Sequence, residues 1–208
     1  MKISYSILVH NETDTLEKLL KFLVKWKQPE DEIVILDDYS DDKKTIELLD
    51  FYVSTNNIVY EQRNLLGDFA SQKNHLKSMG SGDYSFNLDA DEMISLWLIK
   101  NIHDIIEANE GIDLIYLPRI NTVEGVTQAH INAWRWQVNG DGWVNFPDWE
   151  GRIFRSRPNI RWQYKVHEMI TGYQTYATLP TDKPFCILHP KTIDKQEQQN
   201  KKYSGIQR

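Results

Sequence analysis

Residues 83–92 read Asp-Tyr-Ser-Phe-Asn-Leu-Asp-Ala-Asp-Glu, and the rest of the chain is best understood starting from them. The apolar residues in this stretch alternate, as they do in a β-strand, and three carboxylates follow, from Asp89, Asp91 and Glu92. Like charges held together at the end of a strand must be neutralised. Oxygen ligands of this kind select Mg²⁺ or Mn²⁺, ions that also hold substrate phosphates. The pattern indicates a metal and phosphate site; a solvated acidic turn after an edge strand is the alternative that it leaves open.

Strands and helices alternate along the first half of the chain. Apolar runs predict three further strands, at residues 1–9, 33–36 and 58–60. Apolar residues at helical spacing, with cap residues at some of their ends, predict four helices: one over 16–26 that Pro29 closes, one that includes 46–52, and two more at 68–80 and 95–111. Another strand is predicted at 113–117. This alternation predicts the α/β class: a mostly parallel sheet with helices on both faces and right-handed crossovers.

Two acidic clusters occur where predicted strands end. Asp37 and Asp38 follow the strand at 33–36, and Asp89 and Asp91 follow the strand that ends at Leu88. In sheets of this kind, ligands bind beyond the carboxyl ends of the strands. We therefore expect both clusters to line one crevice.

The composition limits the classes of protein to consider. The chain has 208 residues, a net charge of −6 and one cysteine, so it can form a sizeable core and no internal disulfide. It contains no apolar run long enough for a transmembrane helix and no signal-peptide pattern, so we expect a cytoplasmic protein. The acidic balance argues against general nucleic-acid binding. A P-loop, a dinucleotide fingerprint and a nucleophile elbow are all missing from the sequence.

The character of the sequence changes after Pro118, where periodicity weakens and Gly, Asn, Trp and Arg become frequent. We expect an α/β region at 1–118 that carries the acidic crevice, a smaller mixed region at 119–190 that completes the site, and a polar tail at 191–208 that is either a helix or disordered. Four tryptophans lie between 134 and 149; they are either core residues or stacking surfaces for a sugar. Arginines between 152 and 161 either pair with acids or bind an anionic acceptor.

Five segments, in this order, resemble the family 2 glycosyltransferases, which have the nucleotide-sugar-binding GT-A fold. They are residues 6–12, 35–42, 67–74, 88–92 and, as a pair, 152–155 with 166–168. The resemblance extends over roughly residues 3–190 and is nearest to small bacterial or viral enzymes of the lipopolysaccharide-core type. One of these motifs alone is a weak signal, whereas five in order are specific.

The resemblance implies roles for individual residues. The donor site would comprise Val9, Asn11, Glu12, Asp37, Asp38, Asp68, Lys73, Asp89, Ala90 and Asp91. A divalent cation, Mn²⁺ or Mg²⁺, would be held by Asp91, with Asp89 and His167. The base would be Asp148 or Glu150, with Asp148 preferred, and Glu168 would act as a further base or as a partner of the site. Three features depart from the family pattern: Tyr39 stands where Gly is usual, Lys73 where many relatives have Arg, and the usual Glu-Asp spacing before Arg152 is missing.

The expected function is metal-dependent, inverting transfer of a sugar from a nucleoside-diphosphate sugar to a hydroxyl of a glycan, a glycolipid or another acceptor. A special case is transfer to a modified base in viral DNA, which would make a nucleic acid the acceptor. A nucleotidyltransferase would need a glycine-rich basic loop after the first strand, and His10-Asn11-Glu12-Thr13 is not one. A non-catalytic nucleotide-sugar or glycan-binding module remains the alternative from another class, although it would be expected to lack the acids of the site.

Overall fold

The computed structural model describes residues 1–205. Its strands are β1 (Ile3–Val9), β2 (Glu32–Asp37), β3 (Ile58–Gln62), β4 (Tyr84–Asp89), β5 (Met93–Ile94), β6 (Leu114–Glu124), β7 (Val144–Arg155), β8 (Arg161–Gln163), β9 (Met169–Thr171), β10 (Tyr176–Thr178) and β11 (Ile187–Thr192). Its helices are α1 (Asp14–Trp26), α2 (Lys43–Thr55), α3 (Phe69–Met79), α4 (Leu96–Ala108), α5 (Gln128–Trp134) and α6 (Ile193–Gly205), with a 3₁₀ turn, η1 (Lys183–Phe185). None of these helices is long and apolar enough to cross a membrane.

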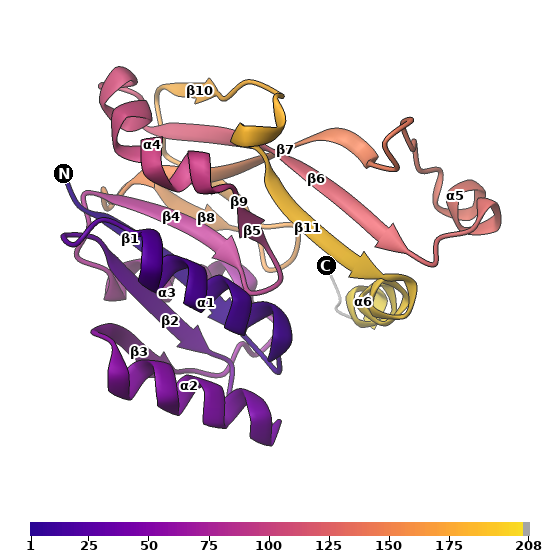
Figure 1. Cartoon of the computed structure of the whole chain (residues 1–208), viewed down its shortest axis with the longest axis horizontal. Coiled ribbons are helices and arrows are strands. Elements are labelled where there is room, and N and C mark those ends of the chain that lie inside the picture. Colours follow the sequence, from indigo (N-terminus) through magenta and orange to yellow (C-terminus); the bar gives the residue numbers. More distant parts are fainter. Residues whose placement is uncertain (206–208) are drawn as a thin grey trace.

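Nine of the described strands form one sheet, in the order β3-β2-β1-β4-β7-β6-β11-β5, with β10 also paired to β6 (Figure 1). The four N-terminal strands pair in parallel, as the alternation of strands and helices predicts. β7 runs antiparallel to both β4 and β6, whereas β11 runs parallel to β6. The predicted class, a mostly parallel α/β sheet with a mixed region after it, is confirmed.

The central strands are buried on both faces because helices cover each side. On β2, Ile33 and Ile35 join the large core formed with α1 and α4, whereas Val34 and Leu36 pack with Leu76 of α3 on the other face. A strand covered on both sides needs apolar residues at every position, and the run at 33–36 has this pattern.

Side chains fix the starts of the helices that approach the site. Asp68 accepts a hydrogen bond from the backbone N–H of Ser71 at 2.8 Å, and Ser95 accepts one from Leu98 N–H at 2.9 Å. Both are cap positions predicted from the sequence. Each cap satisfies a backbone donor that the first turn of a helix leaves without a partner.

The C-terminal half extends the same sheet. β6 runs unbroken through residue 118, so the change in sequence character there is not a break in the sheet. The ends of β6 and β7 extend past the other strands of the sheet as a long arm, and this arm carries α5 away from the body of the molecule (Figure 1). β11 lies between β6 and β5, and the polar tail continues from it as helix α6. Residues 206–208 of the tail lie outside the described part.

Candidate functional site

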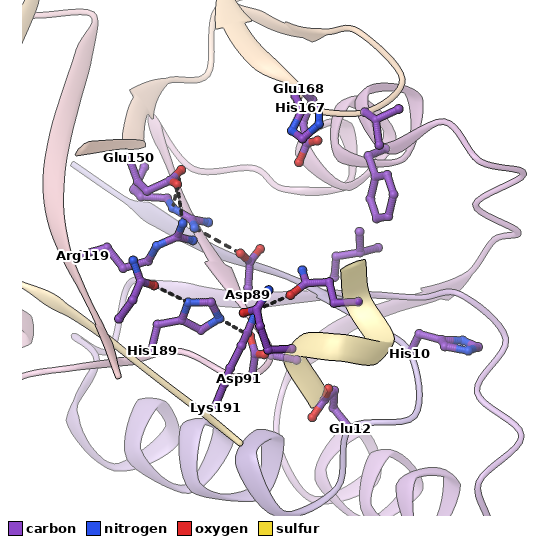
Figure 2. A pocket seen from close by; sticks show the side chains of 18 of the residues that line it. His10, Glu12, Asp89, Asp91, Arg119, Glu150, His167, Glu168, His189 and Lys191 are labelled. Carbon is purple, nitrogen blue, oxygen red and sulfur yellow. Dashed lines mark hydrogen bonds and ion pairs between the residues drawn. The ribbon is translucent and has the colours of Figure 1, made fainter. Parts of the chain in front are cut away.

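A cavity of about 510 Å³ opens at the carboxyl ends of β1 and β4 (Figure 2). The predicted site residues that line it are Val9, Glu12, Asp38, Lys73, Asp89, Ala90, Asp91, Glu150, His167 and Glu168. Asp38, Asp91 and His167 come from three distant parts of the sequence and share this cavity. The two acidic clusters therefore meet at one edge of the sheet, as expected for ligand sites in parallel sheets.

Three predicted donor-site residues support the loops around the cavity and do not line it. The buried carboxylate of Asp37 accepts hydrogen bonds from the backbone N–H and the hydroxyl of Ser40, at 3.0 and 2.6 Å. The side-chain carbonyl of Asn11 accepts the backbone N–H of Asp41 and Asp42, each at 2.9 Å. Asp68 is the cap of α3 described above. These side chains hold the backbone of the loops and of the start of α3, and they affect the site indirectly in this way.

Tyr39 explains why a glycine is usual at its position. Its φ is +44°, in the left-handed region, and its side chain is exposed. A residue with a Cβ is strained in that region, whereas glycine is not. Next to it, the carbonyl of Asp38 lies 2.8 Å from Nδ1 of His10, which also lines the cavity. The substitution thus keeps the loop shape at a conformational cost.

Asp89 belongs to a network of charges in the wall of the cavity. Arg152, which is buried, places Nη2 3.1 Å from Asp89 Oδ2 and 2.7 Å from Oε1 of the fully buried Glu92. Lys73 lies 3.9 Å from the other oxygen of Asp89. Burial alone would raise the pKa of Asp89, but Arg152 and Lys73 hold it well below its usual value. Asp89 is therefore an ionised carboxylate already held by protein cations.

Asp91 faces a different set of partners, on β11 and α6. Its Oδ1 lies 3.5 Å from Nε2 of His189, and its Oδ2 lies 3.2 Å from the Lys195 ammonium. Burial would raise the pKa of Asp91, but the hydrogen bond and charge of His189 lower it to about 2. An ionised carboxylate beside an imidazole is a donor set that suits Mn²⁺.

A chain of hydrogen bonds orients His189. Nδ1 of the imidazole lies 2.7 Å from the side-chain carbonyl oxygen of Asn121, and the Asn121 amide donates to Asp148 Oδ2 at 2.8 Å. Because Asp148 accepts from the amide nitrogen, the amide oxygen of Asn121 faces His189. This arrangement favours a proton on Nδ1 and directs Nε2 at Asp91, where Nε2–H can donate to the carboxylate and a deprotonated Nε2 could bind a metal ion.

The histidine expected beside Asp91 was His167, and the structure brings His189 there instead. His167 is exposed and lies with Glu168 on the side of the cavity opposite Asp91 (Figure 2). Within residues 1–205, no three His, Cys, Asp or Glu side chains are close enough together to hold a metal by themselves. A metal held here would take Asp91 and His189 from the protein and its other ligands from the substrate.

The candidate bases differ in how strongly they are bound. Asp148 does not line the cavity. Its Oδ2 accepts a hydrogen bond from the Asn121 amide at 2.8 Å and another from Arg119 Nη2 at 2.7 Å. Glu168 forms a 2.6 Å ion pair with Lys73. Glu150 lines the cavity with one oxygen 2.7 Å from Arg119 and the other 3.8 Å from Arg152, beyond hydrogen-bond distance. The geometry favours Glu150 over Asp148, which reverses the order preferred from the sequence.

The arginines and tryptophans singled out in the sequence have separate roles. Arg152 belongs to the charge network in the cavity wall, and Arg157 pairs with Asp113 at 2.9 Å, so these arginines bind acids of the same chain. Trp136 lines the cavity, whereas Trp134 stacks on His130 of the arm, with ring centroids 5.2 Å apart. Arg152, Arg155 and Arg157 thus follow the first of the two alternatives, pairing with acids, and the nature of the acceptor stays a prediction.

The sequence did not single out His189, Asn121 or Arg119. Each lies on β6 or β11, and the pairing of these two strands places His189 beside both Asn121 and Asp91. The alternation of Ile187 and His189 marks the two as lying on one face of a strand, but nothing local indicates which strand β11 joins.

Comparison with known proteins places the chain in a family. The family model for glycosyl transferase family 2 matches residues 4–181. A search of curated proteins gives no significant match. Among solved structures, TarS of S. aureus is similar, with 18% identity and a TM-score of 0.65, over 91% of this chain and 37% of that one. A structure of TarS residues 1–349 in complex with UDP-GlcNAc has 18% identity and a TM-score of 0.62, over 92% of this chain and 59% of that one.

This chain therefore spans less than two thirds of the TarS chains that it matches. At this level of identity, the likeness to TarS shows the fold alone, and that fold is the GT-A sheet expected from the sequence. The family model covers most of the chain. The chain belongs to glycosyl transferase family 2.

Proposed function

We propose that this protein transfers a sugar, with inversion, from a nucleoside-diphosphate sugar to an acceptor hydroxyl, and that it uses a divalent cation. The observation that carries the proposal is the placement of Asp91, His189 and Glu150 around one cavity. Asp91 and His189 lie on one side of the cavity and Glu150 on another (Figure 2). A leaving group and an attacking hydroxyl need separate positions of this kind in an inverting reaction. The complex of TarS with UDP-GlcNAc makes a uridine nucleotide the first donor to test.

The residues present fit a divalent cation. Asp91 is ionised, His189 presents Nε2, and substrate phosphates normally supply several ligands of Mg²⁺ or Mn²⁺. When bound, the cation would act as a Lewis acid that neutralises charge on the diphosphate. Asp89, bound by Arg152 and Lys73, would keep Arg152 in place beneath the donor.

Glu150 is the proposed general base. Its carboxylate would accept the proton of the acceptor hydroxyl as that oxygen attacks the anomeric carbon, and the donor bond to the diphosphate would break on the opposite side. A positioned carboxylate contributes typically about 10²–10⁴-fold to the rate. Arg119 holds one oxygen of Glu150 and so fixes its direction. Asp148 would act as a positioning residue, through Asn121 and His189.

The acceptor side of the cavity includes Trp136, Val144 and Asn145 at the base of the β6–β7 arm. An aromatic ring face is a good surface for the apolar face of a sugar, and Asn145 adds hydrogen-bonding groups. We propose that a carbohydrate acceptor, free or lipid-linked, binds here.

A ligand screen tests the donor and the cation together. Thermal unfolding would be followed with UDP-, GDP-, ADP- and TDP-linked sugars, with and without Mn²⁺; a donor that binds raises the midpoint by mass action. Asp91→Asn should abolish the Mn²⁺-dependent part of the shift, whereas Asp104→Asn, an exposed acid on α4, should leave it unchanged. No shift with any of these donors in the parent enzyme would overturn the proposal.

A further inference from the structure

Helix α6 lies against the donor side of the cavity. Gln196 and Gln199 of this helix line the cavity, and Lys195 reaches between two of its acids. The Lys195 ammonium lies 2.5 Å from Glu12 Oε1 and 3.2 Å from Asp91 Oδ2. The three side chains occupy one face of α6, since they follow the i, i+1, i+4 spacing of a helix.

Polar contacts hold α6 in this place. Besides the bonds of Lys195, Lys191 donates to Gln199 at 2.6 Å, and Glu197 lies 3.7 Å from His130 of α5. Among the helix side chains that the structure describes, none is fully buried, and Ile193 is the one apolar residue. The hydrophobic contribution to docking is therefore small, and charges on the cavity determine where α6 lies.

A divalent cation bound at the site would compete with Lys195 for the Asp91 carboxylate. A divalent cation on Asp91 would repel an ammonium 3.2 Å from the same carboxylate. Burial lowers the pKa of Lys195, but its hydrogen bond to Glu12 and the charge of Asp91 raise it above the ordinary value, so the group stays charged. A cation bound at Asp91 would displace the Lys195 ammonium from that carboxylate. If α6 stays in place, the ammonium would then lie beside the diphosphate of the donor.

We propose that Lys195 is a donor-binding residue: it exchanges its bonds to Asp91 and Glu12 for the donor diphosphate, and α6 closes the donor side of the cavity. This inference rests on the proposed function, because it needs a cation on Asp91 and a diphosphate beside it. Lysine suits the role, since its ammonium is a compact charge with three donors on a flexible stem.

The proposal predicts effects of opposite sign from one substitution. In Lys195→Gln, Mn²⁺ alone should bind several-fold more tightly, because the competing ammonium has gone from Asp91. UDP, GDP, ADP or TDP, whichever the parent enzyme binds with Mn²⁺, should bind about 10–100-fold more weakly, the range expected for one lost hydrogen bond between charged groups. The matching nucleoside, which has no diphosphate, should bind as it does to the parent enzyme.

Calorimetric titration of both ligands measures these changes, with two control variants. Lys18→Gln removes the same charge from an exposed position on α1 and should behave as the parent enzyme does. Lys195→Arg keeps a donor cation and should restore most of the diphosphate affinity. Diphosphate affinity within about two-fold of the parent in Lys195→Gln would overturn the inference. So would equal losses for diphosphate, nucleoside and Mn²⁺, which would indicate a structural role. If the parent enzyme binds no nucleoside diphosphate, the proposed function itself fails.

Discussion

Arg152 is the residue whose removal should damage the fold most, because it neutralises the buried carboxylate of Glu92 and also pairs with the partly exposed Asp89. Its guanidinium lies 2.7 Å from Glu92, which is fully buried, and 3.1 Å from Asp89. Breaking a buried ion pair from one side costs about 3–5 kcal/mol, because a charge is left buried without its partner. Arg119, 3.2 Å from Glu92, remains in Arg152→Met, so we expect the lower end, about 3 kcal/mol.

Urea unfolding followed by circular dichroism measures this cost. With a dependence on urea of about 3 kcal/mol per molar for a chain of this size, the midpoint should fall by about 1 M. Arg161→Met removes an exposed arginine and should change the free energy of unfolding by no more than about 0.5 kcal/mol.

The dependence on pH provides an independent check of the cause. Burial raises the pKa of Glu92 and Arg152 opposes that rise, so the pKa should be higher still in Arg152→Met. The folded variant would then bind a proton that the unfolded chain does not, and its deficit should shrink as the pH falls from 7 toward the unfolded pKa of about 4.3. A deficit below about 1 kcal/mol, or one that does not change with pH, would refute the reasoning.

Three further predictions concern the cavity and its loops. Glu150→Gln should lower kcat about 10²–10⁴-fold in a steady-state transfer assay, with little change in donor KM, and a kcat near that of the parent would exclude it as the base. Tyr39→Gly should raise the free energy of unfolding by about 0.5–1 kcal/mol in urea, because it relieves a φ of +44°, whereas Tyr39→Ala, which keeps the Cβ, should not. Asp91, whose folded pKa of about 2 is below the unfolded value, contributes stability above pH ~4 that is lost as the pH falls toward 2. Asp91→Asn should remove about 2 kcal/mol of that acid-sensitive stability in urea unfolding between pH 2 and 6, and an unchanged profile would contradict this assignment.

The predictable part of the fold is the part in which the order of strands and helices along the chain determines which strands pair. β1 to β4 alternate with helices, and right-handed crossovers leave few ways to assemble them, so the shared edge of Asp38 and Asp91 follows from the sequence. The caps of α3 and α4 were also predictable, since a cap acts within three residues of itself.

The part that could not be predicted depends on long-range register. His189 reaches Asp91 only because β11 inserts between β6 and β5, far from its neighbours in sequence. His167 has the more suggestive local context, beside Glu168 in a family motif, yet the loop directs it to the other side of the cavity. Likewise, Asp148 and Glu150 differ by two positions on one strand. The sequence cannot show that Arg119 pairs with both carboxylates, whereas Asn121 binds Asp148.

Because β11 lies within the sheet, the sheet and the site beside Asp91 both need residues near the end of the described chain. The residues matched by the family model end at 181, whereas β11 begins at Ile187 and pairs with both β6 and β5. A chain cut after residue 181 would retain the acids of Asp-x-Asp but would have a gap within its sheet, with no imidazole at Asp91. The proposed metal site therefore depends on β11, and a molecule truncated before Ile187 should lack the imidazole that lies beside Asp91.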